Sequence, residues 1–169
     1  MIKQDILENQ VKPIYIGIGS NLGNRKKNIE YAKHKLLKNN IKIIQSSNYY
    51  ESLSWPNPKN PKFLNIVLRI STVLDSLKLL KQCKNIEFDL GRKKSPKNSP
   101  RVCDIDIIDY KNRSISKDIT LPHPRMHKRN FVLFPLFELD KDWKHPNSKQ
   151  HIKTLILLLS NRDIRSIKQ

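Results

Sequence analysis

Two aspartates, Asp104 and Asp106, stand two positions apart in the apolar sequence VCDIDII. Side chains two positions apart on a β-strand lie on the same face, with their Cα atoms roughly 6.5 to 7 Å apart. Carboxylates at that spacing can converge on one divalent cation or on a pair of cations. Two aspartates on a solvated strand face are the alternative, so the metal site needs support from neighbouring residues.

Cationic side chains surround this pair in the sequence. The stretch before it contains Arg92, Lys93, Lys94, Lys97 and Arg101, and the stretch after it contains His123, Arg125, His127 and Arg129. Arginine matches phosphate oxygens through paired hydrogen bonds, and both Arg and Mg²⁺ neutralise the charge of a transferred phosphoryl group. The surroundings therefore predict a polyphosphate bound with Mg²⁺, whereas Lys93 and Lys97 are expected to face solvent.

An aromatic and amide group forms a second candidate site. Phe63 and Asn65 share one face of a predicted strand, and Phe131 lies in a later apolar segment. A flat heterocycle could stack on a phenyl ring while the amide binds its polar edge. Burial statistics alone favour the alternative that both phenylalanines belong to the core.

The glycines at positions 17, 19 and 23 match neither the GxGxxG pattern of dinucleotide-binding proteins nor a P-loop. We interpret them as turn geometry and close packing.

The chain of 169 residues has a formal net charge of +18. A general bias toward Lys explains much of this charge, an anionic ligand is the next explanation, and nucleic acid is the third. Cys83 and Cys103 form no metal-binding cluster, which fits a reducing compartment. No signal peptide is evident, and the longest apolar run, residues 155–159, is too short to span a bilayer. We therefore expect a cytoplasmic protein without membrane contact.

Apolar periodicity and turn residues assign these side chains to strands, helices and loops. The predicted strands are residues 14–18, 41–47, 63–71 and 101–110, and the predicted helices are residues 25–38, 74–90 and a final one beginning at 152. The order predicts an α+β sandwich with antiparallel strands and helices on one side of the sheet. Residues 1–12 are expected to be an extension, and residues 13–169 a single domain.

Seven motifs stand in order along the chain: YIGIGSNLGNR (15–25), YES (50–52), FLN (63–65), IEFDLGR (86–92), PRVCDIDII (100–108), LPHPRMHKRNFVLFPLFEL (121–139) and DWKHP (142–146). Together they resemble the 6-hydroxymethyl-7,8-dihydropterin pyrophosphokinase family over residues 14 to 159. The resemblance implies a ferredoxin-like sandwich with a four-stranded antiparallel core sheet. It also implies transfer of pyrophosphate from ATP to the pterin alcohol in folate biosynthesis, with release of AMP.

The resemblance further implies a monomer that binds ATP, the pterin and two Mg²⁺ ions, with no nucleic acid. Catalytic roles are implied for Arg92, Arg101, Asp104 and Asp106, of which the two aspartates bind the metal. ATP contacts are implied for Leu80, Lys84, Glu87, Lys94, Arg101, Ile107, His123 and Arg129. Pterin contacts are implied for Ser52, Leu53, Ser54, Phe63, Asn65, Asp104 and Phe131.

Four positions differ from the family pattern. Asn98 and Ser99 stand where many relatives have Trp-Gly, Lys84 replaces a common Gln, and Lys94 replaces a common Arg. The first change removes an aromatic contact from the loop at 92–100. The alternative function is an RNA-binding module on a similar sandwich, because RNFV at 129–132 matches part of an aromatic RNA-binding motif.

Overall fold

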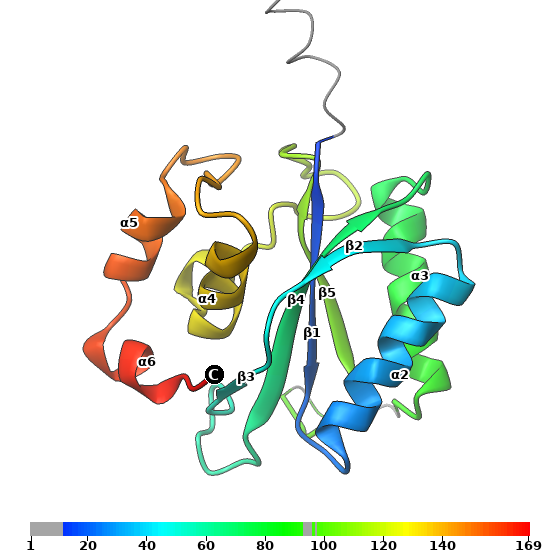
Figure 1. Ribbon diagram of the computed structural model, residues 1–169, viewed down its shortest axis with the longest axis horizontal. Helices are drawn as coiled ribbons and strands as arrows, with labels where there is room; N and C mark the ends of the chain where they lie inside the picture. Colours follow the sequence, from blue (N-terminus) through cyan, green and yellow to red (C-terminus); the bar gives the residue numbers. More distant parts are fainter. Residues whose placement is uncertain (1–11, 93–95, 97) are drawn as a thin grey trace, which may run out of the picture.

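An antiparallel sheet forms the middle layer of the protein (Figure 1). The computed structural model describes residues 12–92, 96 and 98–169, so almost all of the expected extension 1–12 lies outside the described residues. The elements in order are β1 (Ile14–Ser20), α2 (Arg25–Lys38), β2 (Lys42–Ser46), β3 (Tyr50–Ser52), β4 (Phe63–Ser71), α3 (Ser76–Asp89), β5 (Asp104–Tyr110), a 3₁₀ turn (Met126–Lys128), α4 (Asn130–Leu139), α5 (Ile152–Leu157) and α6 (Asn161–Ser166).

The strands follow the order β2-β4-β1-β5, and the short strand β3 pairs with β4 beyond the end of β2. Every pair of neighbouring strands is antiparallel. Without β3, the elements follow the β–α–β–β–α–β order of a ferredoxin-like sandwich. The predicted fold class and its four-stranded core are therefore confirmed, and β3 is a fifth strand that the sequence did not predict.

The helix at 25–38 and the strand at 63–71 have the predicted bounds. The strand expected at 101–110 begins only at Asp104, because Arg101 pairs with a turn instead of with a strand. The Arg101 backbone N–H donates to Asn21 Oδ1 over 2.7 Å, and the Arg101 carbonyl accepts from the Asn21 N–H over 3.2 Å. This pairing holds Arg101 beside the turn that follows β1.

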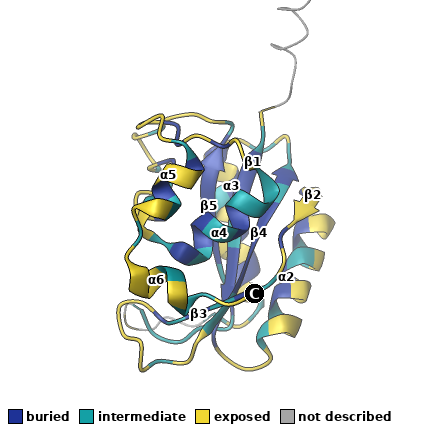
Figure 2. Ribbon diagram, turned by 60° about the vertical axis from the view of Figure 1, so that its left-hand side comes forward, coloured by how far each residue is buried: buried dark blue, intermediate teal, exposed yellow. Residues whose placement is uncertain are grey.

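Helices cover both faces of the sheet, so the prediction of helices on one side is wrong. Figure 1 shows α2 and α3 on one face and α4, α5 and α6 on the other. The strands can be covered twice because both of their faces are apolar: in β1, Ile16 belongs to the core under α2 and α3, and Tyr15 to the core under α4. Buried residues accordingly lie along the sheet and the inner helix faces (Figure 2). The segment 131–139 is so uniformly apolar that it showed no helical period.

A β-bulge shifts the register of β5 against β1. Tyr15 pairs with Asp109 and Ile16 with Ile107, so Ile108 is the extra residue. Ile108 packs in the core under α4, and Asp109 bonds to Trp143 of the same core. Two consecutive residues of β5 therefore face α4.

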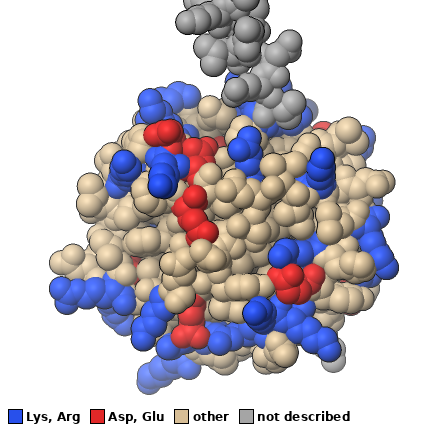
Figure 3. Space-filling model, in the orientation of Figure 1, with Lys and Arg blue, Asp and Glu red and all other residues tan. Residues whose placement is uncertain are grey.

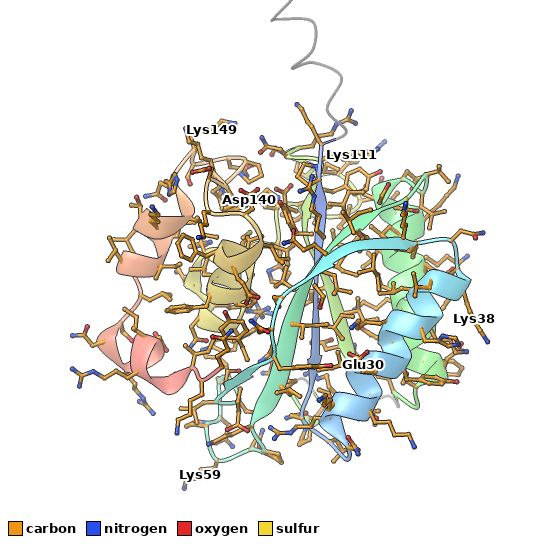
Figure 4. All side chains as sticks on the ribbon, viewed as in Figure 1. Glu30, Lys38, Lys59, Lys111, Asp140 and Lys149 are labelled. Carbon is orange, nitrogen blue, oxygen red and sulfur yellow. The ribbon has the colours of Figure 1, made fainter. Side chains whose placement is uncertain are left out.

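Asp109 belongs to a buried polar network at this end of the sheet. Its carboxylate accepts hydrogen bonds from Trp143 Nε1 over 2.8 Å and from the Asn112 backbone N–H over 2.9 Å. Nearby, the Tyr15 hydroxyl donates to Asp140 over 2.8 Å; Asp140 is labelled in Figure 4. Asp109 is 1 % exposed, and burial raises its pKa from 3.8 to about 6.

This raised pKa predicts how Asp109→Asn changes stability with pH. A carboxyl whose pKa is higher in the folded state stabilises the protein at low pH, and the benefit is lost as pH rises through about 6. The stabilisation that Asp109 loses by pH 7 amounts to about 3 kcal/mol. Asparagine does not titrate, so the stability of Asp109→Asn relative to the parent should increase by about that amount between pH 4 and pH 7. Urea denaturation at both pH values measures it, and a difference that stays constant would contradict the prediction.

Candidate active site

A cavity of about 230 Å³ opens on the α4 side of the sheet, above the middle strands. It brings together eleven of the residues predicted from the sequence. These are Leu53, Phe63, Asn65, Lys84, Arg92, Arg101, Asp104, Asp106, His123, Arg129 and Phe131. The aromatic and amide group and the charged group, which lie far apart in the sequence, therefore line the same cavity.

The register of the central strand β1 explains this convergence. Gly17 lies opposite Asp106, and Gly19 lies between Asp104 on one neighbouring strand and Asn65 on the other. Residues directly opposite each other on paired strands point to the same face. The two aspartates and Asn65 thus project to one side, and the glycines add no side chain between them.

Gly19 has no room for a larger residue. A Cβ at this position would lie 2.9 Å from Asn65 Oδ1 and 3.3 Å from Phe63 Cδ1. The glycine is required by close packing, as the sequence analysis expected of this stretch. The backbone of β1 forms the floor beneath both side chains.

Each aspartate contacts cationic side chains. Asp104 accepts hydrogen bonds from Arg92 Nη1 over 2.8 Å and from Arg101 Nη1 over 3.2 Å. Although burial acts to raise it, the pKa of Asp104 is held below its ordinary value by the charges of Arg101, Lys84 and Arg92. Asp104 is therefore a carboxylate at neutral pH, as a metal ligand must be.

Asp106 lies near Arg129 and His123. Its Oδ2 atom is 3.6 Å from Arg129 Nη1 and 3.8 Å from His123 Nε2. Burial lowers the pKa of His123, and the neighbouring arginines lower it further against the opposing effect of Asp106. The two aspartates thus lie at the centre of a ring of basic groups.

Glu87 on α3 supports this arrangement from beneath the cavity. It is 1 % exposed and accepts hydrogen bonds from Lys84 Nζ over 2.7 Å and from the Ile105 backbone N–H over 2.6 Å. It also forms an ion pair with Arg92, which spans Glu87 and Asp104. Burial raises the pKa of Glu87. Glu87 therefore orients Arg92 toward the aspartate.

The aromatic end of the cavity contains Phe63, Phe131 and Asn65. Both phenylalanines line the cavity and are only half-buried, so they are not enclosed core residues. Asn65 Nδ2 donates to Ser52 Oγ over 3.0 Å and to the Tyr50 carbonyl over 3.3 Å. These two bonds use both hydrogens of the amide nitrogen, which leaves Oδ1 as the acceptor available to a ligand.

Some predicted site residues lie outside the residues that line this cavity. Ile107 is buried on the opposite face, because alternation along β5 points it toward α3. Leu80 packs against that same core, and Ser52 accepts a hydrogen bond from the Asn65 amide. Ser54 lines a neighbouring cavity of about 490 Å³. Lys94 lies outside the described residues. The roles implied for these residues remain predictions.

The structure adds residues that the sequence reasoning did not assign to the site. Asn21 ties two cavity loops together: besides its bonds with Arg101, its Nδ2 donates to Ser54 Oγ over 3.3 Å and to the Pro61 carbonyl over 3.1 Å. Trp55 lines the cavity with the Arg125 guanidinium 5.3 Å from its ring centre. The only sequence signal for Asn21 was its place in the GSNLG turn.

The carboxylates fit a magnesium ion in their chemistry. Magnesium prefers oxygen ligands and commonly combines one or two protein carboxylates with phosphate oxygens and water. Within residues 12–92, 96 and 98–169, no group of three or more His, Cys, Asp or Glu side chains could hold a metal ion. Asp104 and Asp106 would therefore share the ion with a substrate.

On the face shown in Figure 3, Lys and Arg lie at separate places and do not form one patch. This distribution agrees with a general residue bias as a source of the charge of +18. Inside the cavity, Lys84, Arg92, Arg101, Arg125 and Arg129 bring several positive charges together.

Comparison with protein families decides among the proposed functions. The family model described as 7,8-dihydro-6-hydroxymethylpterin-pyrophosphokinase (HPPK) matches residues 15–141. The chain belongs to this family. The match spans β1 through α4, and therefore all the elements that line the cavity. Nothing in the comparisons supports the RNA-binding alternative.

Relatives of two kinds share this domain. The 2-amino-4-hydroxy-6-hydroxymethyldihydropteridine pyrophosphokinase of Aquifex aeolicus is 38 % identical over 141 residues, 83 % of this chain and 88 % of the relative. The folic acid synthesis protein fol1 of Pneumocystis carinii is 36 % identical over 163 residues, 95 % of this chain. The chain spans only 22 % of that longer relative.

Solved structures confirm the fold. An HPPK-DHPS crystal structure determined in complex with substrates superimposes with a TM-score of 0.67 at 16 % identity, covering 86 % of this chain and 43 % of that one. The HPPK-DHPS of Plasmodium falciparum superimposes with a TM-score of 0.65 at 15 % identity, and the match covers 89 % of this chain and 46 % of that one. At these identities the likeness establishes the shared sandwich.

Glu87 and Glu51 allow a matched test of the buried charge. Each glutamate pairs with two cationic side chains, Glu87 with Lys84 and Arg92, and Glu51 with Arg25 and Lys62. Only Glu87 is buried. Glu87→Gln should lower the free energy of unfolding by about 1 to 3 kcal/mol, because two cations lose their buried, charged hydrogen-bond acceptor. Glu51→Gln should lower it by less than about 1 kcal/mol.

Chemical denaturation of both variants measures these losses. Equal losses would show that the buried charge of Glu87 has no special role in the network.

Proposed function

We propose that this chain transfers pyrophosphate from ATP to the hydroxymethyl group of 6-hydroxymethyl-7,8-dihydropterin, releasing AMP, as a step of folate synthesis. The observation that carries the proposal is a single cavity lined both by two aspartates with arginines around them and by an aromatic, amide-bearing group, Phe63, Asn65 and Phe131. The family match and the name of the Aquifex relative, which this chain covers almost completely, agree with it.

The aromatic end would bind the pterin. Phe63 and Phe131 offer two ring faces for a flat heterocycle, and Asn65 Oδ1 can accept hydrogen bonds from the ring N–H groups. The backbone from Ser52 to Ser54 would contribute further contacts. The side chains use few rotatable bonds, so binding costs little conformational entropy.

The cationic end would bind the triphosphate. Arg92, Arg101 and Arg129 lie at the aspartates, and Lys84 and His123 line the same wall. Their charges would neutralise the phosphate oxygens and align the chain of phosphates toward the pterin. Leu80, Glu87, Lys94 and Ile107 are proposed to complete the ATP site.

Asp104 and Asp106 would hold two Mg²⁺ ions with ATP, and the bound ions would acidify the pterin alcohol and neutralise phosphate charge. The residues of the cavity then align the alcohol oxygen with the β-phosphorus. A bond forms between that oxygen and the β-phosphorus while the alcohol proton passes to water. The bond from the β-phosphorus to the oxygen bridging it to the α-phosphate breaks, so AMP leaves with that oxygen. Arg101, on the loop next to β5, would stabilise the charge on the transferred group.

We further propose that residues 13–169 act as one domain and that the protein is a cytoplasmic monomer. Cys83 and Cys103 are free and buried, which fits a reducing compartment. Among the residues that the structure describes, no helix combines the length and apolar character needed to cross a bilayer.

The function is tested by incubating the protein with ATP, Mg²⁺ and the pterin alcohol and separating the nucleotides. AMP should appear together with the pterin pyrophosphate. Asp104→Asn should lower kcat at least about 100-fold, because the carboxylate charge that faces the cations and the metal is lost. ADP as the product would indicate an ordinary kinase, and the absence of turnover in the parent would reject the proposal.

Gly19→Ala should separate the pterin end of the site from the ATP end. The new methyl group would displace Asn65 and Phe63, which lie 2.9 Å and 3.3 Å from its position. We expect the KM for the pterin to rise about tenfold, because overpacking of this kind costs roughly 1 to 3 kcal/mol. The KM for ATP should change less than twofold. Steady-state kinetics with each substrate varied in turn gives both values, and an unchanged pterin KM would remove Asn65 and Phe63 from the pterin site.

A further inference from the structure

Residues 160–168, here called the C-terminal strap, cross the α4 side of the molecule and reach β3 (Figure 1). The strap comprises α6 and the residues up to Lys168, and it lies beyond the family match at 15–141. It contributes no residue to the lining of the 230 Å³ cavity. Its contacts nevertheless reach both elements that border the aromatic end.

The first contact anchors the start of α4. Asn130 is 8 % exposed, and its Nδ2 donates to the Asp163 carbonyl over 2.6 Å and to Ser166 Oγ over 3.1 Å. Its Oδ1 accepts from the Phe131 backbone N–H over 2.7 Å. One side chain thus joins the strap to the backbone of a phenylalanine that lines the cavity.

This anchor replaces an ordinary helix cap. Arg129 at the N-cap position of α4 makes no side-chain capping bond. The first backbone N–H groups of a helix need partners, and an uncapped first turn frays. Phe131 lies in that first turn. Its position therefore depends on the other contacts of this turn, which include the bonds from Asn130 to the strap.

The second contact anchors β3. The Glu51 N–H donates to the Lys168 carbonyl over 2.7 Å, and the Lys168 N–H donates to the Glu51 carbonyl over 3.0 Å. The other edge of β3 pairs with β4, where Ser52 lies opposite Phe63 and Tyr50 opposite Asn65. The strap therefore extends the sheet at the strand whose Ser52 orients the Asn65 amide.

We propose that the C-terminal strap is a positioning element that sets the spacing between Phe131 on α4 and the β3–β4 pair, and thereby the width of the pterin slot; the inference rests on the proposed function. The slot has one wall on α4 and the other on β4, and residues 160–168 are bonded to both sides. A slot held at its bound width avoids the cost of ordering its walls when the ligand binds.

Two variants remove the two contacts separately. Asn130→Ala deletes the bonds to Asp163 and Ser166 together with the local bond to the Phe131 N–H. Lys168→Pro deletes the N–H that donates to Glu51, whereas Lys168→Ala keeps both main-chain bonds and is its matched control. The preceding Ile167 is extended with φ −91° and ψ 138°, the conformation that a residue before proline prefers. Arg165→Ala, at an exposed position of α6, is the control for Asn130→Ala.

The readout is the KM for each substrate together with kcat and the melting temperature. In Asn130→Ala and in Lys168→Pro we expect the KM for the pterin to rise about tenfold. The KM for ATP and kcat should stay within twofold, and both control variants should match the parent. Equal increases in the two KM values, or an unchanged pterin KM in both folded variants, would overturn the inference.

Hydrogen exchange separates the strap from the proposed reaction. The backbone amides of Ser52 and Leu53 in Asn130→Ala, and those of Ser52, Leu53 and Phe131 in Lys168→Pro, should exchange faster than in the parent, whether or not any substrate turns over. Unchanged exchange would reject the strap as a positioning element. A parent protein that forms no AMP would instead reject the proposed function, and the exchange result would still show whether the strap holds the two elements.

Discussion

The register of β1 between β4 and β5 is the constraint on which the site depends. It sets Gly17 opposite Asp106, and Gly19 between Asp104 and Asn65. Each polar side chain that faces the cavity from β4 or β5 thus lies opposite a glycine of β1. The central strand therefore contributes empty volume, while its neighbours contribute the functional groups. A shift of β1 by one residue would point its isoleucines into this space.

Charge balance in the cavity follows from that geometry. Burial and the charge of Asp104 act to raise the pKa of Glu87, and Lys84, Arg92 and His123 pair with the acids of the cavity. An excess of cations over anions suits a site whose ligand carries several negative charges. Arg92, Arg101 and Arg129, which contribute to the +18 charge of the chain, converge in this cavity.

Local sequence patterns predicted the helices and strands whose apolar residues follow a single helical or strand spacing. Helix α2 and strand β4 had the expected bounds, and the alternation around Asp104 and Asp106 placed both acids on one face. Three features depend on distant residues and left little local signal. Strand β3 has only three residues, α4 is apolar at every position except Asn130 and Glu138, and Asn21 acts through bonds to loops 33 and 80 positions away.

The bulge at Ile108 divides β5 into two halves that alternate independently. Before the bulge, the side chains at even-numbered positions of β5 face the cavity. After it, the Asp109 side chain faces α4, and the Tyr110 side chain faces the core under α2 and α3. An extra or missing residue in the second half could be absorbed by the bulge without reversing the aspartates. The number of residues after the bulge can thus change without turning Asp104 and Asp106 away from the cavity.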